Sequence, residues 1–229
     1  MPEPKLTEDD LKDIILAFSE ARMKPYLNAT NNSYSDAIRI YEINTKLCEA
    51  MYPSLHTLEI SLRNQMNTVL SVKYDNDWFT NGNIQLEKYE RDTINSALIK
   101  CKNNLNNLIP ELNFGFWKSL INQRFYQSTI WNPCSKQIFK YAQKSELNII
   151  DIRLKIRKIL KLRNRTFHHE PIWNYLNIDI VHRDIHFFIN LINPKVGNWL
   201  REYDRFPEIY EITSNQLDLI KIYPNKKFS

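Results

Sequence analysis

The chain has 229 residues, a net charge of +5 and a pI near 9.0, and 43% of its residues are apolar. Its three glycines, Gly82, Gly115 and Gly197, are isolated, which excludes a glycine-rich phosphate loop and disfavours an all-β fold with many tight turns. The sequence therefore predicts an all-α protein, and its basic excess favours encounters with a polyanion such as RNA.

Cysteine usage and apolar patterning indicate where the chain resides. Its three cysteines form no CxxC pair, as is typical of reduced thiols, and its first residues contain no apolar signal sequence. No run of about 18 apolar residues is present, so no membrane span is expected. Together these features predict a cytoplasmic protein.

Helical periodicity begins close to the start of the chain. Thr7 and Asp10 form a capping-box pattern before an apolar helical stripe. A second helix is expected from Ser35 to Met51, where Pro53 stops it, and Ser54 is expected to cap a third helix.

The later elements follow the same pattern. We expect a long polar helix over 84–108, a helix that starts at Pro110, and helices over 146–169 and 179–192. We expect one helical domain at 1–202, with 203–229 as an extension that is packed on it or partly flexible. Within this extension, EIYEIT at 208–213 is compatible with a short strand.

The segment LRNRTFHHEP at 162–171 carries the densest set of reactive side chains. Helical spacing from Ile156 through Leu160 to Phe167 places Arg163 on the apolar stripe. An arginine in that position requires a carboxylate or a phosphate as its partner. The segment is therefore a candidate site.

Arg163 and His168 lie five positions apart, about 140° around an ideal helix, so they cannot converge on one atom within one straight helix. Either the last turn distorts before Pro171, or a second copy of the chain supplies the partner residue. Asn164 and His168 are i,i+4 neighbours and can touch.

Arginine, asparagine and histidine together suit the cleavage of RNA without a metal or another cofactor. Histidine exchanges protons near neutral pH, and arginine stabilises the charge that grows on a phosphorane. We expect Arg163 in the second role, His168 in the first with His169 as the alternative, and Asn164 to orient them. Glu170 is expected to pair with a base. The expected products are a 2′,3′-cyclic phosphate and a 5′-hydroxyl.

Other interpretations of the histidines remain open. Basic residues in a last helical turn stabilise the helix dipole, which by itself accounts for His168 and His169. A metal site at this pair is disfavoured, because adjacent helical histidines point about 100° apart. His182 and His186, at i,i+4, fit a zinc pair, but a partly buried histidine pair is favoured.

Several residues outside the segment are candidates for supporting roles. Glu59 and Arg63 form either a structural ion pair or a shell that holds Arg163 or His168. The basic residues of 153–165, Lys161 and Arg165 among them, form either a phosphate-binding surface or a solubilising face. The aromatic residues at 114, 116 and 117 are expected in the core rather than stacked on bases.

LRNRTFHHEPIW resembles the signature of the Abi-like (abortive infection) family of the HEPN superfamily, which carries an R-x4-6-H motif. Arg163 forms this motif with either His168 or His169. Further blocks resemble the family in the expected order: FSEARMKPYL, AIRIYEINTKL, LEISLRNQM, DWF, FGFWKSL and IWNP. Arg63 and Asn64 belong to the LEISLRNQM block, which no histidine follows at 65–68, so a second R-x4-H motif is not expected.

The resemblance implies a HEPN-like helical bundle and a homodimer with a composite ribonuclease site. It also implies a role in phage defence or toxin-like growth inhibition, with an RNA or protein antitoxin as a partner. A non-catalytic module that binds RNA or a partner in the same defence system is the alternative. A helical scaffold whose HHEP segment stabilises the dimer is a third.

Overall fold

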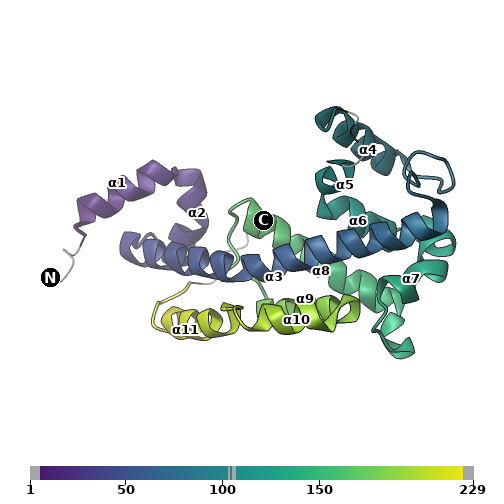
Figure 1. The fold of residues 1–229 in the computed structure, drawn as a ribbon. Coiled ribbons are helices and arrows are strands. Elements are labelled where there is room, and N and C mark those ends of the chain that lie inside the picture. The colour runs from purple at the N-terminus through teal and green to yellow at the C-terminus, as the bar shows by residue number, and fades with distance from the viewer. Residues whose placement is uncertain (1–5, 103, 105–106, 224–229) are drawn as a thin grey trace. The chain divides into compact units, whose positions relative to one another are not determined.

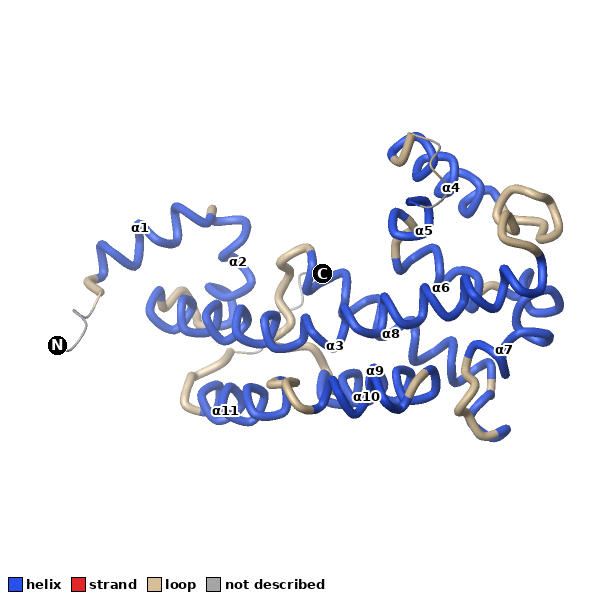
Figure 2. The backbone as a smooth tube through the Cα atoms, viewed as in Figure 1, coloured by secondary structure: helices blue, strands red, loops and turns tan. Residues whose placement is uncertain are grey.

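The computed structural model describes residues 6–102, 104 and 107–223, and these residues contain helices and no strand (Figures 1 and 2). The helices are α1 (Glu8–Phe18), α2 (Glu20–Ala29), α3 (Tyr34–Tyr74), α4 (Lys88–Lys100), α5 (Leu108–Glu111), α6 (Phe114–Asn122), α7 (Asn132–Ile138), α8 (Ile149–Phe167), α9 (Ile178–Ile192), α10 (Pro194–Arg201) and α11 (Phe206–Asp218). Short 3-10 or π segments are η2 (Arg124–Tyr126), η3 (Gln127–Trp131) and η4 (Lys144–Leu147). The all-α prediction is confirmed.

Two compact units make up the chain, each from separated stretches. The first contains the described residues of Met1–Tyr52, Arg165–Asp179 and Asp204–Ser229. The second contains those of Pro53–Asn164 and Ile180–Tyr203. The boundaries expected from the sequence, 1–202 and 203–229, stay a prediction, and 224–229 lie outside the described residues.

Local signals account for several helix ends. The capping box predicted at Thr7 is confirmed, since its hydroxyl accepts the N–H of Asp10 and the Asp10 carboxylate accepts the N–H of Thr7. The predicted stop at Pro53 is wrong, because α3 continues through it. A proline removes one helical hydrogen bond, and here buried residues on both sides, Met51 and Leu55, continue the apolar stripe.

Two further predictions need correction. The polar helix expected over 84–108 is shorter: α4 ends at Lys100, and Lys102 adopts a positive φ of 52°, which a helix cannot contain. Positions 103, 105 and 106 of that range lie outside the described residues. The strand option for EIYEIT is wrong, because 208–213 lie inside α11, where Phe206 and Thr213 are buried.

In the second unit, an aromatic cluster forms much of the core. Trp78, Phe116 and Trp117 are fully buried, with the ring centroids of the last two 5.1 Å apart. Phe114 is also buried. The expectation that the aromatic residues of 114–117 belong to the core is confirmed, and burial removes them as platforms for bases.

In the first unit, helix α3 anchors the segment that follows the HHEP sequence. The side-chain oxygen of Asn44 accepts the backbone N–H groups of Ile172 and Trp173, at 2.6 and 3.1 Å. Another backbone bond, from the N–H of Tyr223 to the carbonyl of Ala29, joins the end of the described chain to the end of α2. The segment that follows His169 is therefore held by hydrogen bonds to other residues of the first unit.

No helix in the described parts of the chain combines the length and the apolar character needed to cross a bilayer.

Candidate active site

Arg163 lies at the edge of the buried stripe of helix α8. The buried positions are Ile152, Ile156, Ile159 and Leu162. The expectation that Arg163 lies on the stripe itself is wrong by one position, because the buried stripe runs through Ile159 and Leu162 rather than through Leu160 and Arg163. The Arg163 side chain is 21% exposed.

Glu59 of α3 holds the Arg163 guanidinium. Its Oε2 lies 3.3 Å from Arg163 Nε, and the Glu59 side chain is 20% exposed, so this ion pair is largely withdrawn from water. Arg163 Nη1 also donates to the side-chain oxygen of Asn164, at 3.5 Å. These three residues form what we call the arginine cluster.

Arg63 does not compete for Glu59. Arg63 Nε donates to the side-chain oxygen of the neighbouring Asn64, at 3.2 Å. No ion pair between Glu59 and Arg63 is found among the described residues. Of the two interpretations of Glu59 left open by its spacing, the geometry therefore favours the one in which Glu59 holds Arg163.

The chain leaves helical geometry directly after Phe167. His168 and His169 are exposed, and His169 has a φ of +57°. The N–H of His169 donates to the carbonyl of Thr166 at 3.3 Å, and that of Glu170 donates to the carbonyl of Arg165 at 2.8 Å. This bond pair is a Schellman motif, in which the left-handed position is usually glycine.

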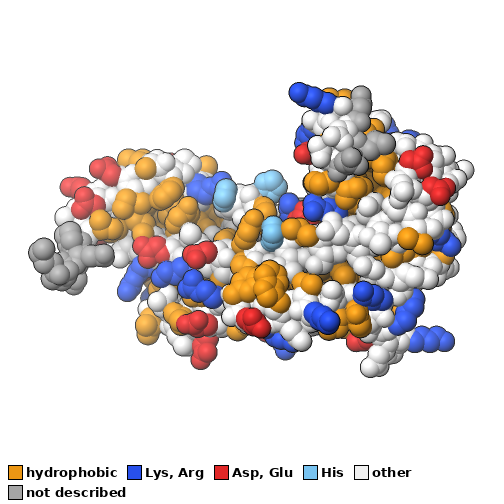
Figure 3. Space-filling model, in the orientation of Figure 1, with side chains coloured by type: hydrophobic (Ala, Val, Ile, Leu, Met, Phe, Trp, Pro, Cys, Tyr) orange, Lys and Arg blue, Asp and Glu red, His pale blue; other side chains and the backbone are white. Residues whose placement is uncertain are grey.

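A non-glycine residue at a left-handed position is uncommon, and such strain concentrates at functional sites. We call residues 166–170 the histidine turn. The turn departs from helical geometry before Pro171. This distortion is one of the two ways, next to a second copy of the chain, by which Arg163 and His168 were expected to act together. Histidine side chains reach the surface on the face shown in Figure 3, among charged side chains of both signs.

Arg22 of α2 binds the backbone of the histidine turn. Its Nη1 donates to the carbonyl of His169 and, at 3.4 Å, to that of His168. Arg22 was not among the residues predicted from the sequence, and it lies 146 residues before His168. Its only signal was its place inside FSEARMKPYL, one of the blocks that resemble the family.

Arg165 and Tyr26 lie in the same unit as the histidine turn. Arg165 Nε lies 3.5 Å from a carboxylate oxygen of Glu170, as expected for Glu170, and its guanidinium lies 5.8 Å from the Tyr175 ring. Burial raises the pKa of Tyr26, an effect that the charges of Arg22 and Arg165 partly oppose. The buried Tyr26 hydroxyl has no hydrogen-bond partner within the described chain, and it stays protonated.

The candidate residues thus form two groups, one in each unit. Arg163, Asn164, Glu59, Arg63, Asn64 and Lys161 belong to the second unit. His168, His169, Arg165, Glu170 and Arg22 belong to the first. The R-x4-H motif therefore spans the boundary between them.

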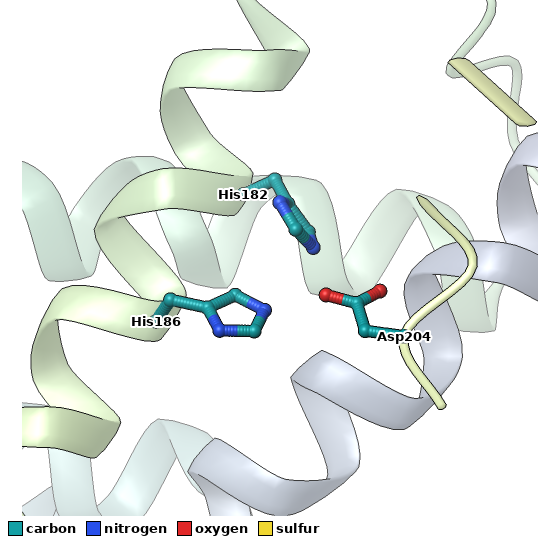
Figure 4. A group of neighbouring side chains, drawn as sticks. All are labelled: His182, His186 and Asp204. Carbon is teal, nitrogen blue, oxygen red and sulfur yellow. The ribbon is translucent and has the colours of Figure 1, made fainter. Parts of the chain in front are cut away.

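His182 and His186 share a serine as a neighbour. Both project from α9 (Figure 4), and Nε2 of each lies 3.3 Å from Oγ of Ser54, which is fully buried. His182 is 6% exposed, and the two ring centroids are 4.6 Å apart. His182 is buried and His186 is partly buried, so both interpretations of the pair, as packed histidines and as metal ligands, stay open.

Comparison with known proteins adds no family. No protein-family model matches the chain, and neither a curated protein nor a solved structure does. The fold and the two groups of residues define an all-α protein with a carboxylate-held arginine and a strained, exposed histidine turn five residues further along the chain.

Proposed function

We propose that this protein is a HEPN-type endoribonuclease that cleaves RNA without a metal. The observation that carries the proposal is the pairing of two features within one short segment: an arginine fixed by Glu59, and two exposed histidines on a strained turn. An arginine held in one orientation can stabilise charge without first reorganising. A histidine exposed to solvent can exchange the protons that the reaction moves.

In the proposed reaction the 2′-oxygen of a ribose attacks the adjacent phosphorus, and the bond from phosphorus to the 5′-oxygen breaks. His168 takes the proton from the 2′-hydroxyl or delivers one to the leaving 5′-oxygen, and His169 is the alternative. Arg163 stabilises the phosphorane, while Asn164 orients the reacting groups. The products are a 2′,3′-cyclic phosphate and a 5′-hydroxyl, so no water is consumed in this step.

A homodimer with a composite site belongs to the same proposal. A two-fold axis would bring two copies of the R-x4-H motif to one interface. Arg163 of one copy and His168 of the other would then act on the same phosphate. The resemblance to Abi-like proteins supports a role in phage defence or growth inhibition, with an RNA or protein antitoxin as the restraint.

The second candidate function is RNA or partner binding without cleavage. It is favoured by the ion pair of Arg163, because Glu59 neutralises part of the positive charge that a phosphorane would need. In that case Arg163 contributes to binding alone, and the histidines have no role in proton transfer.

Incubation of the purified protein with end-labelled RNA in EDTA separates the two functions. The enzyme predicts fragments with cyclic-phosphate ends, lost in Arg163→Gln and in His168→Ala, and retained in Lys195→Gln as a matched control. Circular dichroism must show an unchanged fold in each variant. Binding that weakens in Arg163→Gln but survives His168→Ala, without cleavage by any form, refutes the enzyme and supports the binding module.

A further inference from the structure

A line of basic side chains runs along one face of helix α8. Arg153, Arg157 and Lys161 follow one another at i+4, and Asn164 comes three residues later. On an ideal helix these four positions lie within about 80° of one another and extend over about 16 Å. Asn164 touches Arg163, so the line leads to the arginine cluster.

Two other basic residues of this region are already engaged by carboxylates. Lys155 forms an ion pair with Asp184 of α9, and Arg165 pairs with Glu170. By contrast, Arg157 and Lys161 are exposed, and neither has an ion-pair partner among the residues that the structure describes. The structure thus separates the paired cations of α8 from those available to a ligand.

Lys118 of α6 and Arg124 of η2 lie close enough to basic residues of α8 for their charges to interact. Arg153 donates from Nε to the carbonyl of Ile121 at 3.0 Å and from Nη2 to that of Gln123 at 3.1 Å, which ties α8 to the end of α6. Burial, and then the charge of Arg157, lowers the pKa of Lys118. Burial, and then the charge of Arg124, lowers the pKa of Arg153.

The like charges of these five residues repel one another. Within the described residues, no carboxylate forms an ion pair with any of the five. A polyanion relieves this repulsion at several positions at once, with release of its counterions. Lys118, Arg124, Arg153, Arg157 and Lys161 form what we call the basic track.

We propose that the basic track binds the backbone of single-stranded RNA and leads it to Asn164 and Arg163. The role of this ligand as a substrate rests on the proposed ribonuclease function. The α8 positions from Arg153 to Asn164 extend over about 16 Å, which matches about five stacked nucleotides at about 3.4 Å each. A single strand is favoured over a duplex, because in-line attack by a 2′-hydroxyl requires backbone conformations that A-form pairing prevents.

Salt dependence of binding measures phosphate contacts directly. The probe is a fluorescein-labelled ten-nucleotide RNA with 2′-O-methyl groups, which cannot be cleaved, and its affinity is measured by anisotropy between about 50 and 200 mM salt. Each lost contact is expected to reduce the slope of log K against log salt by about 0.7. Arg157→Gln and Lys161→Gln should each lose that amount, and the double variant about 1.4.

Lys195→Gln is the matched control, since Lys195 is an exposed lysine of the same unit on α10. A double variant with the slope of this control overturns the basic track, even if cleavage is intact. A reduced slope without cleavage of natural RNA by the unaltered protein supports the track and overturns the ribonuclease. Polyglutamate that competes as well as RNA at equal charge identifies an acidic protein as the ligand and overturns the RNA assignment.

Discussion

Replacing His169 by glycine is expected to stabilise the protein, although it removes a side chain from the candidate site. The His169 backbone has a φ of +57°, and a left-handed conformation costs an ordinary residue about 1–2 kcal/mol. Glycine avoids that cost but gains about 0.4–1 kcal/mol of freedom in the unfolded chain, so the net gain is about 0.5–1 kcal/mol. For a chain of this size, such a gain raises the Tm by about 1–4 °C.

Thermal and urea unfolding, followed by circular dichroism, measure this effect. His169→Ala is the matched control, because it removes the same imidazole but keeps a Cβ at the left-handed position, so no gain in Tm is expected. Equal stability of the glycine and alanine variants would refute the strain at His169. The glycine variant also separates the two histidines, since full cleavage by His169→Gly assigns proton transfer to His168, and loss of cleavage assigns it to His169.

Three further predictions concern the groups that hold the site. Glu59→Gln should lower the free energy of unfolding by about 1–2 kcal/mol, because the Arg163 guanidinium loses the carboxylate of its ion pair; urea titration checks this, and an unchanged midpoint contradicts it. Arg22→Ala should cost about 1–3 kcal/mol and speed amide exchange in the histidine turn relative to α9; equal exchange rates would exclude an anchoring role. Burial raises the pKa of Cys48 from 9.0 to about 11, so at pH 9 iodoacetamide should alkylate this thiol more slowly in the native protein than in urea, as read by peptide mass spectrometry. Because the unfolded thiol loses its proton first, Cys48 should lower the free energy of unfolding as pH rises from 9 to 11; a Cys48→Ser variant with the same decline counts against this.

The features that the sequence predicted well are those determined by neighbours along the chain. The Thr7 capping box needs only residues 7–10, and helices α8 and α9 begin and end within three residues of the expected limits. The burial of Trp117 follows from its place on an apolar helical face. In each case local hydrogen bonding and helical periodicity decide the outcome.

The features that the sequence could not predict depend on partners remote in the chain. Spacing alone left Glu59 with Arg63 or Arg163 as its partner, and the structure brings Glu59 to Arg163, which is 104 residues away in the sequence. Arg22 reaches its carbonyl acceptors only through the fold of the first unit. At Pro53 the local rule predicted a stop, but burial on both sides of the proline outweighed the lost bond.

The division of the chain between the two units affects the order in which these units can fold during synthesis. Residues 53–164 supply most of the second unit as one continuous stretch, so this unit can begin to fold as that stretch leaves the ribosome. The first unit includes a backbone hydrogen bond from Tyr223 to Ala29, so it cannot close fully until the chain has been synthesised through residue 223. The histidine turn belongs to this unit, so its fixed geometry follows the synthesis of residues that lie far beyond the motif itself.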